Sequence, residues 1–294
     1  MKRLFVRSGG GLPGLDIHAG IWDALEMAGI YPTHVSGTSA GAIASAFQAG
    51  PMLDADIFHG LISSLSDEQV RVERPLWKLR VPWIGWYLDS APILSLLEHY
   101  LPEHFDRLTL QLQCWAVNAR DGGAVNVARP ELARSPAEAA LASMSICGVF
   151  APVRLLDGNE YFDGGPAMNL PVPANANDFD EIYLLVATGR PGSYSDDESM
   201  LTRLIHNAHW MMDDQIHDTI AQARESCRAK VHVIWPDLPT PRGALHFDHN
   251  LIDQAQLWTE AWIRKEFNAK ALREAQGAKT DAELATDEHG FSRQ

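Results

Sequence analysis

The sequence predicts a single α/β domain built around a mostly parallel sheet. Three observations lead to this fold class. Continuous apolar runs, such as Leu4-Phe5-Val6 and the segment Ile182 to Ala187, are typical of strands that are buried on both faces. Segments with helical spacing of apolar residues alternate with these runs. No internal repeat or low-complexity linker interrupts the 294 residues, so we expect one domain over 1–294.

Helices are expected wherever the apolar residues recur with a period near 3.6 and a start or stop signal is present. Gly29 and Gly50-Pro51 supply stops, Pro92 suits a first turn, and Ser135-Pro136-Ala137-Glu138 resembles a capping start. The expected helices cover 15–29, 40–49, 54–73, 92–100, 135–144, 199–228 and 253–275.

Strands are expected at short apolar runs next to turn residues. The turns Asp121-Gly122-Gly123 and Asp157-Gly158-Asn159 each predict a hairpin. The expected strands cover 4–6, 33–36, 112–118, 124–128, 153–156, 160–162, 182–187 and 231–235.

Charge and hydropathy limit the classes of partner. The chain has 24 Lys and Arg against 38 Asp and Glu, so its net charge is 24 − 38 = −14 with His neutral. A field of this sign repels nucleic-acid phosphates, and no nucleic-acid partner is expected. No run approaches the ~18 apolar residues of a membrane span, and the first residues lack the apolar core of a signal peptide. We therefore expect a cytoplasmic protein, for which peripheral contact with membranes stays open.

The first motif that carries chemistry is Gly37-Thr38-Ser39-Ala40-Gly41, a G-x-S-x-G pentapeptide between an expected strand and an expected helix. A sharp strand-to-helix turn lifts a nucleophile clear of the sheet, and the flanking glycines leave room for close approach. The following helix directs its N-terminus at Ser39, which favours a developing oxyanion. The alternative is an ordinary Gly/Ser turn, and the strand–helix context favours the nucleophile.

The second motif is the glycine-rich turn Gly9-Gly10-Gly11-Leu12-Pro13-Gly14. Its G-x-G-x-x-G pattern also occurs in dinucleotide sites, which require an acidic residue at the end of the second strand. Here that strand runs directly into the Ser39 turn, so a nicotinamide cofactor is not expected. Consecutive glycines can instead present free N–H groups to an anion, as an oxyanion hole requires. A purely structural turn is the other reading.

The third motif is Asp163-Gly164-Gly165, which follows the strand over 160–162 and precedes Asn169 and Pro171. A carboxylate delivered to this turn can act as general base on a serine hydroxyl without a histidine. Asp-Gly-Gly is also a common turn, so this motif indicates a catalytic base only in combination with the other two motifs.

Together, and in this order, the three motifs resemble the patatin-like phospholipase family. The resemblance spans about residues 4–190, including the approach from Ala142 to Val153. It implies a three-layer α/β/α fold and hydrolysis of acyl esters of phospholipids or related lipids by a Ser-Asp dyad. It implies Ser39 as nucleophile, Asp163 as base, and the amides of Gly10 and Gly11, with Gly9, as oxyanion hole. No metal or cofactor is implied, and the expected partner is a lipid or acyl-ester substrate.

The sequence departs from the family pattern at two positions. Ser8 stands where the family usually has Asp, and Pro13 stands where it usually has Arg or Lys. The missing cation bears on rate and substrate range. A soluble-ester esterase, an acyltransferase of the same fold and a non-catalytic lipid-binding or regulatory protein therefore remain alternatives.

The remaining histidines, the Trp-rich segment and the C-terminal part allow further interpretations. A Ser-His-Asp triad would need a base after Asp163, and the candidates are His206, His209, His217, His232, His246 and His249. Only the segment His246-Phe247-Asp248-His249 carries turn chemistry, and we interpret it as a solvated loop rather than a base or a metal site. The Trp-rich segment 75–90 is either a lid that meets lipid or part of the core. The C-terminal part, about 199–275, is expected to be helical without an assigned role.

Overall fold

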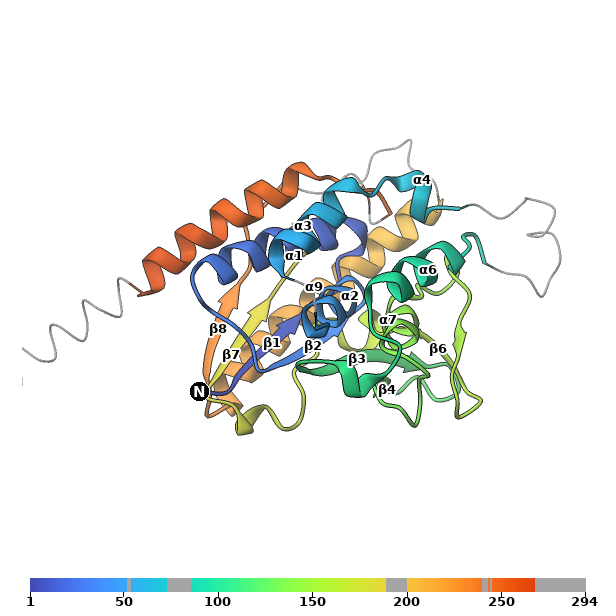
Figure 1. Ribbon diagram of the computed structural model, residues 1–294, viewed down its shortest axis with the longest axis horizontal. Helices are drawn as coiled ribbons and strands as arrows, with labels where there is room; N and C mark the ends of the chain where they lie inside the picture. The colour runs from blue at the N-terminus through green and yellow to red at the C-terminus, as the bar shows by residue number, and fades with distance from the viewer. Residues whose placement is uncertain (52–53, 73–85, 189–199, 240–242, 244, 268–294) are drawn as a thin grey trace, which may run out of the picture.

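A computed structural model describes residues 1–51, 54–72, 86–188, 200–239, 243 and 245–267, and it contains an eight-stranded sheet (Figure 1). The strand order is β5-β6-β3-β2-β1-β7-β8, with β4 also paired to β3. The run β3-β2-β1-β7-β8 is parallel, and β4, β5 and β6 join antiparallel at one end. The prediction of a mostly parallel sheet is confirmed. The strands are β1 (Arg3–Arg7), β2 (His34–Thr38), β3 (Gln111–Asn118), β4 (Ala124–Asn126), β5 (Val153–Arg154), β6 (Glu160–Asp163), β7 (Glu181–Leu185) and β8 (Lys230–Ile234).

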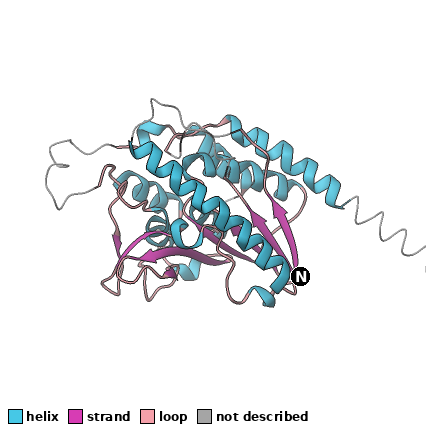
Figure 2. Cartoon of the chain, turned by 180° about the vertical axis from the view of Figure 1, so that it is seen from behind, coloured by secondary structure: helices cyan, strands magenta, loops and turns pink. Residues whose placement is uncertain are grey.

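Helices cover both faces of this sheet. One face carries most of them, and the other is crossed by the long helix α9, which Figure 2 shows in front of the strands. This arrangement confirms the three-layer α/β/α fold. The helices are α1 (Gly11–Met27), α2 (Ala40–Ala49), α3 (Ala55–Ser64), α4 (Asp67–Val70), α6 (Ala91–Tyr100), α7 (Pro136–Met144), α8 (Gly165–Met168), α9 (Met200–Ser226) and a helix over 250–267.

Successive side chains of the central strands enter different cores, which explains their continuous apolar sequence. Phe5 of β1 packs against Tyr183 of β7, with ring centroids 5.2 Å apart, in the core beneath α1 and α2. Leu4 and Val6 point to the opposite face and join Ile216 of α9 in a second core. Because both faces of β1 are covered, polar side chains are excluded from most of the strand.

Most element boundaries differ from the predictions by one to three residues, and two differences are larger. The helix expected over 54–73 is divided into α3 and α4, because Ser66 caps α4 in a capping box with Gln69. Helix α1 begins at Gly11, four residues before the predicted start, with Pro13 in its first turn, where a proline is tolerated.

Two expectations lie partly outside the described residues. Positions 75–85 of the expected lid, with Trp77 and Trp83, are among them, as are positions 268–275 of the last expected helix. Trp86 is described and lies beside Phe162, with ring centroids 6.5 Å apart. Within the described ranges, none of the helices has the length and apolar character needed to cross a bilayer.

Candidate active site

Ser39 occupies the strand-to-helix turn between β2 and α2 in a strained backbone conformation. Its φ is 55° and its ψ is −124°, and among the described residues it is the one non-glycine residue with positive φ. Such a conformation costs on the order of 1–3 kcal/mol and persists only when the surroundings enforce it. The residue is 7% exposed and begins α2, so the helix N-terminus points at its side chain.

The two glycines of G-x-S-x-G are required by close backbone packing. A Cβ atom at Gly37 would lie 2.2 Å from the Gly41 carbonyl oxygen. One at Gly41 would lie 2.5 Å from the carbonyl oxygens of both Arg7 and Ser8. The motif therefore presses the start of α2 against the ends of β1 and β2, and this contact enforces the turn at Ser39.

Asp163 reaches Ser39 through the register of β3. Thr38 of β2 lies opposite Trp115 of β3, and the next residue of β3, Ala116, lies opposite Asp163 of β6. Residues 39 and 163, 124 positions apart, are thereby brought together at one end of these strands.

The Asp163 carboxyl is 6% exposed, and its two oxygens have different surroundings. Oδ1 accepts the N–H of Gly165 at 2.7 Å, whereas Oδ2 has no hydrogen bond of standard geometry among the described residues. Burial raises the pKa of Asp163 to about 6, and weaker interactions with the Ser39 hydroxyl and the Gly165 amide oppose this rise. The carboxyl is thus ionised at neutral pH and has an oxygen available to the hydroxyl.

The glycine turn lies beside Ser39 and leaves two of its three amides without an acceptor. A Cβ atom at Gly9 would be 3.1 Å from the Ser39 Cβ. The N–H groups of Gly10 and Gly11, next to the start of α1, find no acceptor among the described residues. The N–H of Gly9 is already engaged, because it donates to the main-chain oxygen of Asn169 at 3.2 Å and to its Oδ1 at 3.0 Å. The Gly9 N–H, which we expected to be one of the oxyanion donors, is therefore not free in this structure.

The two departures from the family pattern have local structural explanations. The Ser8 hydroxyl donates to the Gly9 carbonyl and accepts the N–H of Ala187, both at 2.9 Å, and so fastens the turn to the end of β7. Pro13 lies buried in the first turn of α1 and presents no charge.

A buried cation lies behind the turn and was not found by the motif analysis. The Arg7 guanidinium donates to Gln48 Oε1 at 2.6 Å, and burial lowers its pKa to about 9, so it stays charged at neutral pH. Burial and the charge of Arg7 lower the pKa of His18 to about 3. His18 is therefore neutral and donates from Nε2 to the Ser8 carbonyl at 2.9 Å.

Ser143 and Asn169 are two further residues that hold the site together. The Ser39 N–H donates to Ser143 Oγ at 3.0 Å, and this hydroxyl donates to the Trp115 carbonyl at 2.6 Å. Asn169 joins the segment after Asp163 to the glycine turn. The only sequence signal for them was their place within the stretches that resemble the family.

The alternative bases and the metal site find no support in the geometry. His249 Nδ1 lies 2.8 Å from Asp16, and His246 Nδ1 lies 2.6 Å from Asp67. The His246 and His249 side chains are 48% and 37% exposed, as expected for a solvated loop, and these pairs hold the loop in place. In the described part of the chain no three His, Cys, Asp or Glu side chains are grouped as metal ligands would be.

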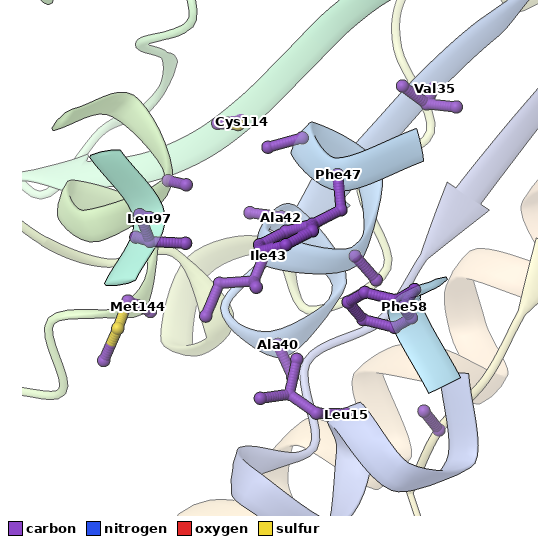
Figure 3. Close-up of a cluster of buried hydrophobic side chains, with 14 of the residues drawn as sticks. Leu15, Val35, Ala40, Ala42, Ile43, Phe47, Phe58, Leu97, Cys114 and Met144 are labelled. Atoms are coloured by element: carbon purple, nitrogen blue, oxygen red, sulfur yellow. The ribbon is translucent and has the colours of Figure 1, made fainter. Parts of the chain in front are cut away.

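Ser39 opens onto an apolar pocket with about 720 Å³ of empty space, part of it open to solvent. Ile43 and Phe47 follow Ser39 along α2 and line this pocket, together with Leu97 of α6 and Met144 of α7. Figure 3 shows these four side chains in one cluster of buried hydrophobic residues. Gly11 lines the same pocket as Ser39. The pocket suits a hydrocarbon chain attached to an ester at Ser39.

A strained serine, a buried carboxyl and a helix N-terminus on a doubly covered α/β sheet are typical of serine acyl hydrolases. The profile described as Patatin-like phospholipase matches residues 5–175, more than half of the chain, and the chain belongs to this family. Membership supports lipid acyl hydrolase activity in general. The crystal structure of VipD from Legionella pneumophila is similar with a TM-score of 0.46 and 16% identity, over 88% of this chain and 67% of that one. No curated protein matches the chain.

The strain at Ser39 predicts different stabilities for two variants at this position. Ser39→Gly relieves the positive φ, whereas Ser39→Ala keeps it. We expect the Gly variant to exceed the Ala variant by about 1–2 kcal/mol in free energy of unfolding, measured by urea titration. Equal stability of the two variants would contradict the strain.

The buried carboxyl predicts a pH-dependent gain in stability for Asp163→Asn. A rise in pKa from 3.8 to about 6 costs the native state about 3 kcal/mol once the group is ionised. The native state binds the proton more tightly, so wild-type stability falls as pH rises from about 4 to 6. We expect Asp163→Asn to be more stable than wild type at pH 8, by up to about 3 kcal/mol, and the gain to vanish near pH 4. A gain independent of pH would argue against this cause.

Proposed function

We propose that the protein is a serine lipid acyl hydrolase that cleaves acyl ester bonds of phospholipids or related lipids with Ser39 and Asp163. The observation that carries the proposal is the meeting of a strained serine and a buried carboxyl that has one oxygen without a standard partner. The free amides of Gly10 and Gly11 and the apolar pocket support the same assignment.

In the proposed acylation, Ser39 Oγ attacks the ester carbonyl carbon while Asp163 Oδ2 takes the hydroxyl proton. The N–H groups of Gly10 and Gly11, with the N-termini of α1 and α2, stabilise the oxyanion. Asp163 then returns the proton to the alcohol oxygen as the ester bond breaks, which leaves the acyl group on Ser39. Because the base must be ionised, this step requires a pH above the Asp163 pKa of about 6.

In the proposed deacylation, Asp163 takes a proton from water, whose oxygen attacks the acyl carbonyl. The same amides stabilise the second oxyanion, and the proton returns to Ser39 Oγ as the fatty acid leaves. The Gly165 amide holds Oδ1 throughout, so that Oδ2 keeps its direction. A dyad suffices because one carboxylate performs both proton transfers.

The proposed catalytic roles are tested by covalent labelling and product analysis. We expect a fluorophosphonate probe to label Ser39, and mass spectrometry of mixed phospholipids and neutral lipids to show free fatty acid. Ser39→Ala and Asp163→Asn should each lower turnover by at least about a thousandfold. Ser63→Ala, an exposed serine of α3, is the matched control and should retain full activity. Wild-type rates in either dyad variant would refute the mechanism.

The buried aromatic ring of Phe47, which lines the pocket, predicts a limit on acyl-chain length. Phe47 lies eight residues after Ser39 on α2, about 12 Å along the helix axis, and packs against Phe58 with ring centroids 5.3 Å apart. We expect Phe47→Leu to shift the optimum towards longer chains in a p-nitrophenyl ester series from butyrate to palmitate.

Phe179→Leu is the matched control for this shift, because it removes the same ring from the core on the opposite face of the sheet. The control should leave the chain-length profile unchanged. A folded Phe47→Leu variant with the wild-type profile would exclude Phe47 as the limit.

A further inference from the structure

The pocket at Ser39 has a deep zone and a rim that differ in burial. In the deep zone Ile43, Phe47 and Leu97 are each less than 10% exposed. At the rim Leu245 and Phe247 are only partly buried, although they line the same pocket and pack against the same core. The rim is thus an apolar surface next to the mouth that part of a bound molecule can cover.

Hydrogen bonds from α4 hold the rim segment in place. Asp67 accepts the Phe247 N–H at 2.9 Å through Oδ1, and its Oδ2 lies 2.6 Å from His246 Nδ1. Arg71, the charged residue among those lining the pocket, directs its Nη1 at His246 at 3.2 Å. Polar groups therefore fix the segment from outside, and its apolar side chains are left to face the pocket.

A second anchor comes from α1. The buried Asp16 accepts the Asp248 N–H at 2.8 Å, and its other oxygen lies 2.8 Å from His249 Nδ1. His249 Nε2 lies 2.9 Å from the Leu65 carbonyl oxygen. With anchors on both sides, the positions of Leu245 and Phe247 are defined without a bound lipid.

The position of the ester relative to these zones follows from the proposed function, on which this inference rests. Ser39 and Gly11 hold the carbonyl, and the acyl chain extends over Ile43 and Phe47 into the deep zone. The residue after Gly11, Leu12, lines the same pocket and is partly buried, as are Leu245 and Phe247. In this placement the alcohol side of the bound ester extends along Leu12 towards Leu245 and Phe247.

We infer that Leu245 and Phe247 form a site for a second hydrocarbon chain, carried on the alcohol side of the ester, and that Phe247 determines the preference for two-chain over one-chain lipids. A phospholipid with two chains covers these side chains and gains the free energy of burying them. A one-chain lipid of the same headgroup leaves them exposed to water. Neither residue lies in the part of the chain that matches the family, 5–175.

The test measures binding without hydrolysis. The probes are a short-chain dialkyl ether phosphocholine and its monoalkyl counterpart, both below their micelle-forming concentrations, titrated into Ser39→Ala protein by calorimetry. We expect Phe247→Ala, added to this background, to weaken dialkyl binding about tenfold and monoalkyl binding less than twofold. Leu245→Ala is a second variant at the rim and should change the same ratio in the same direction. Leu257→Ala, on the helix over 250–267, removes a side chain that is 67% exposed and should change neither value.

Each outcome separates the rim from the chemistry. Equal losses for both lipids, or none in folded variants, would overturn the two-chain site whatever Ser39 does. A tenfold loss confined to the dialkyl lipid would support it even if the fluorophosphonate probe left Ser39 unlabelled, and that silence would count against the proposed hydrolase alone.

Discussion

The site depends on the register of one strand. β3 pairs in parallel with β2 along its first half and antiparallel with β6 along its second half. This switch places the last residue of β2 next to Trp115, and the last residue of β6 next to Ala116. Since β3 lies between β2 and β6, these two strands are about 10 Å apart, a distance that the side chains at their ends can bridge. A slip of β6 by one residue would direct the Asp163 side chain to the other face of the sheet.

Two local costs are concentrated at this point. Ser39 holds an unfavourable backbone conformation, and Asp163 keeps a buried carboxylate that burial makes harder to ionise. Both are sustained by contacts that carry no chemistry of their own. Gly37 and Gly41 allow the backbone of α2 to pack tightly, and the apolar cores on both faces hold the strands that bring these segments together. Backbone strain and desolvation of this kind are characteristic of functional sites. The strained turn lifts a nucleophile clear of the sheet, and desolvation brings the pKa of a carboxylate base close to neutral pH.

The sequence alone could predict features that depend on neighbouring residues, but not features that depend on residues far apart in the chain. The turn at Ser39 and the position of Asp163 at a strand end are encoded by neighbouring residues, so motif and periodicity were sufficient. The division of the helix over 54–73 was also readable, since Ser66 and Gln69 form a local capping box. The hydrogen bond of the Gly9 amide could not be predicted, because its acceptor Asn169 is 160 residues away. A glycine turn whose amides are all free would have the same local sequence.

The position of the segment 245–249 is another feature that the sequence alone could not predict. His246 and His249 look like a polar loop in sequence, and only their contacts with Asp67 and Asp16 reveal that the loop has a fixed position beside the pocket. Ser39, Asp163 and the glycine turn, to which we assign the chemistry, all lie within 5–175, the part shared with the family. Leu245 and Phe247 lie outside it and line the pocket. A change there can alter what is bound while the register that aligns hydroxyl and carboxyl is left intact. The proposed chemistry and the proposed selection of substrate thus depend on separate sets of contacts around one pocket.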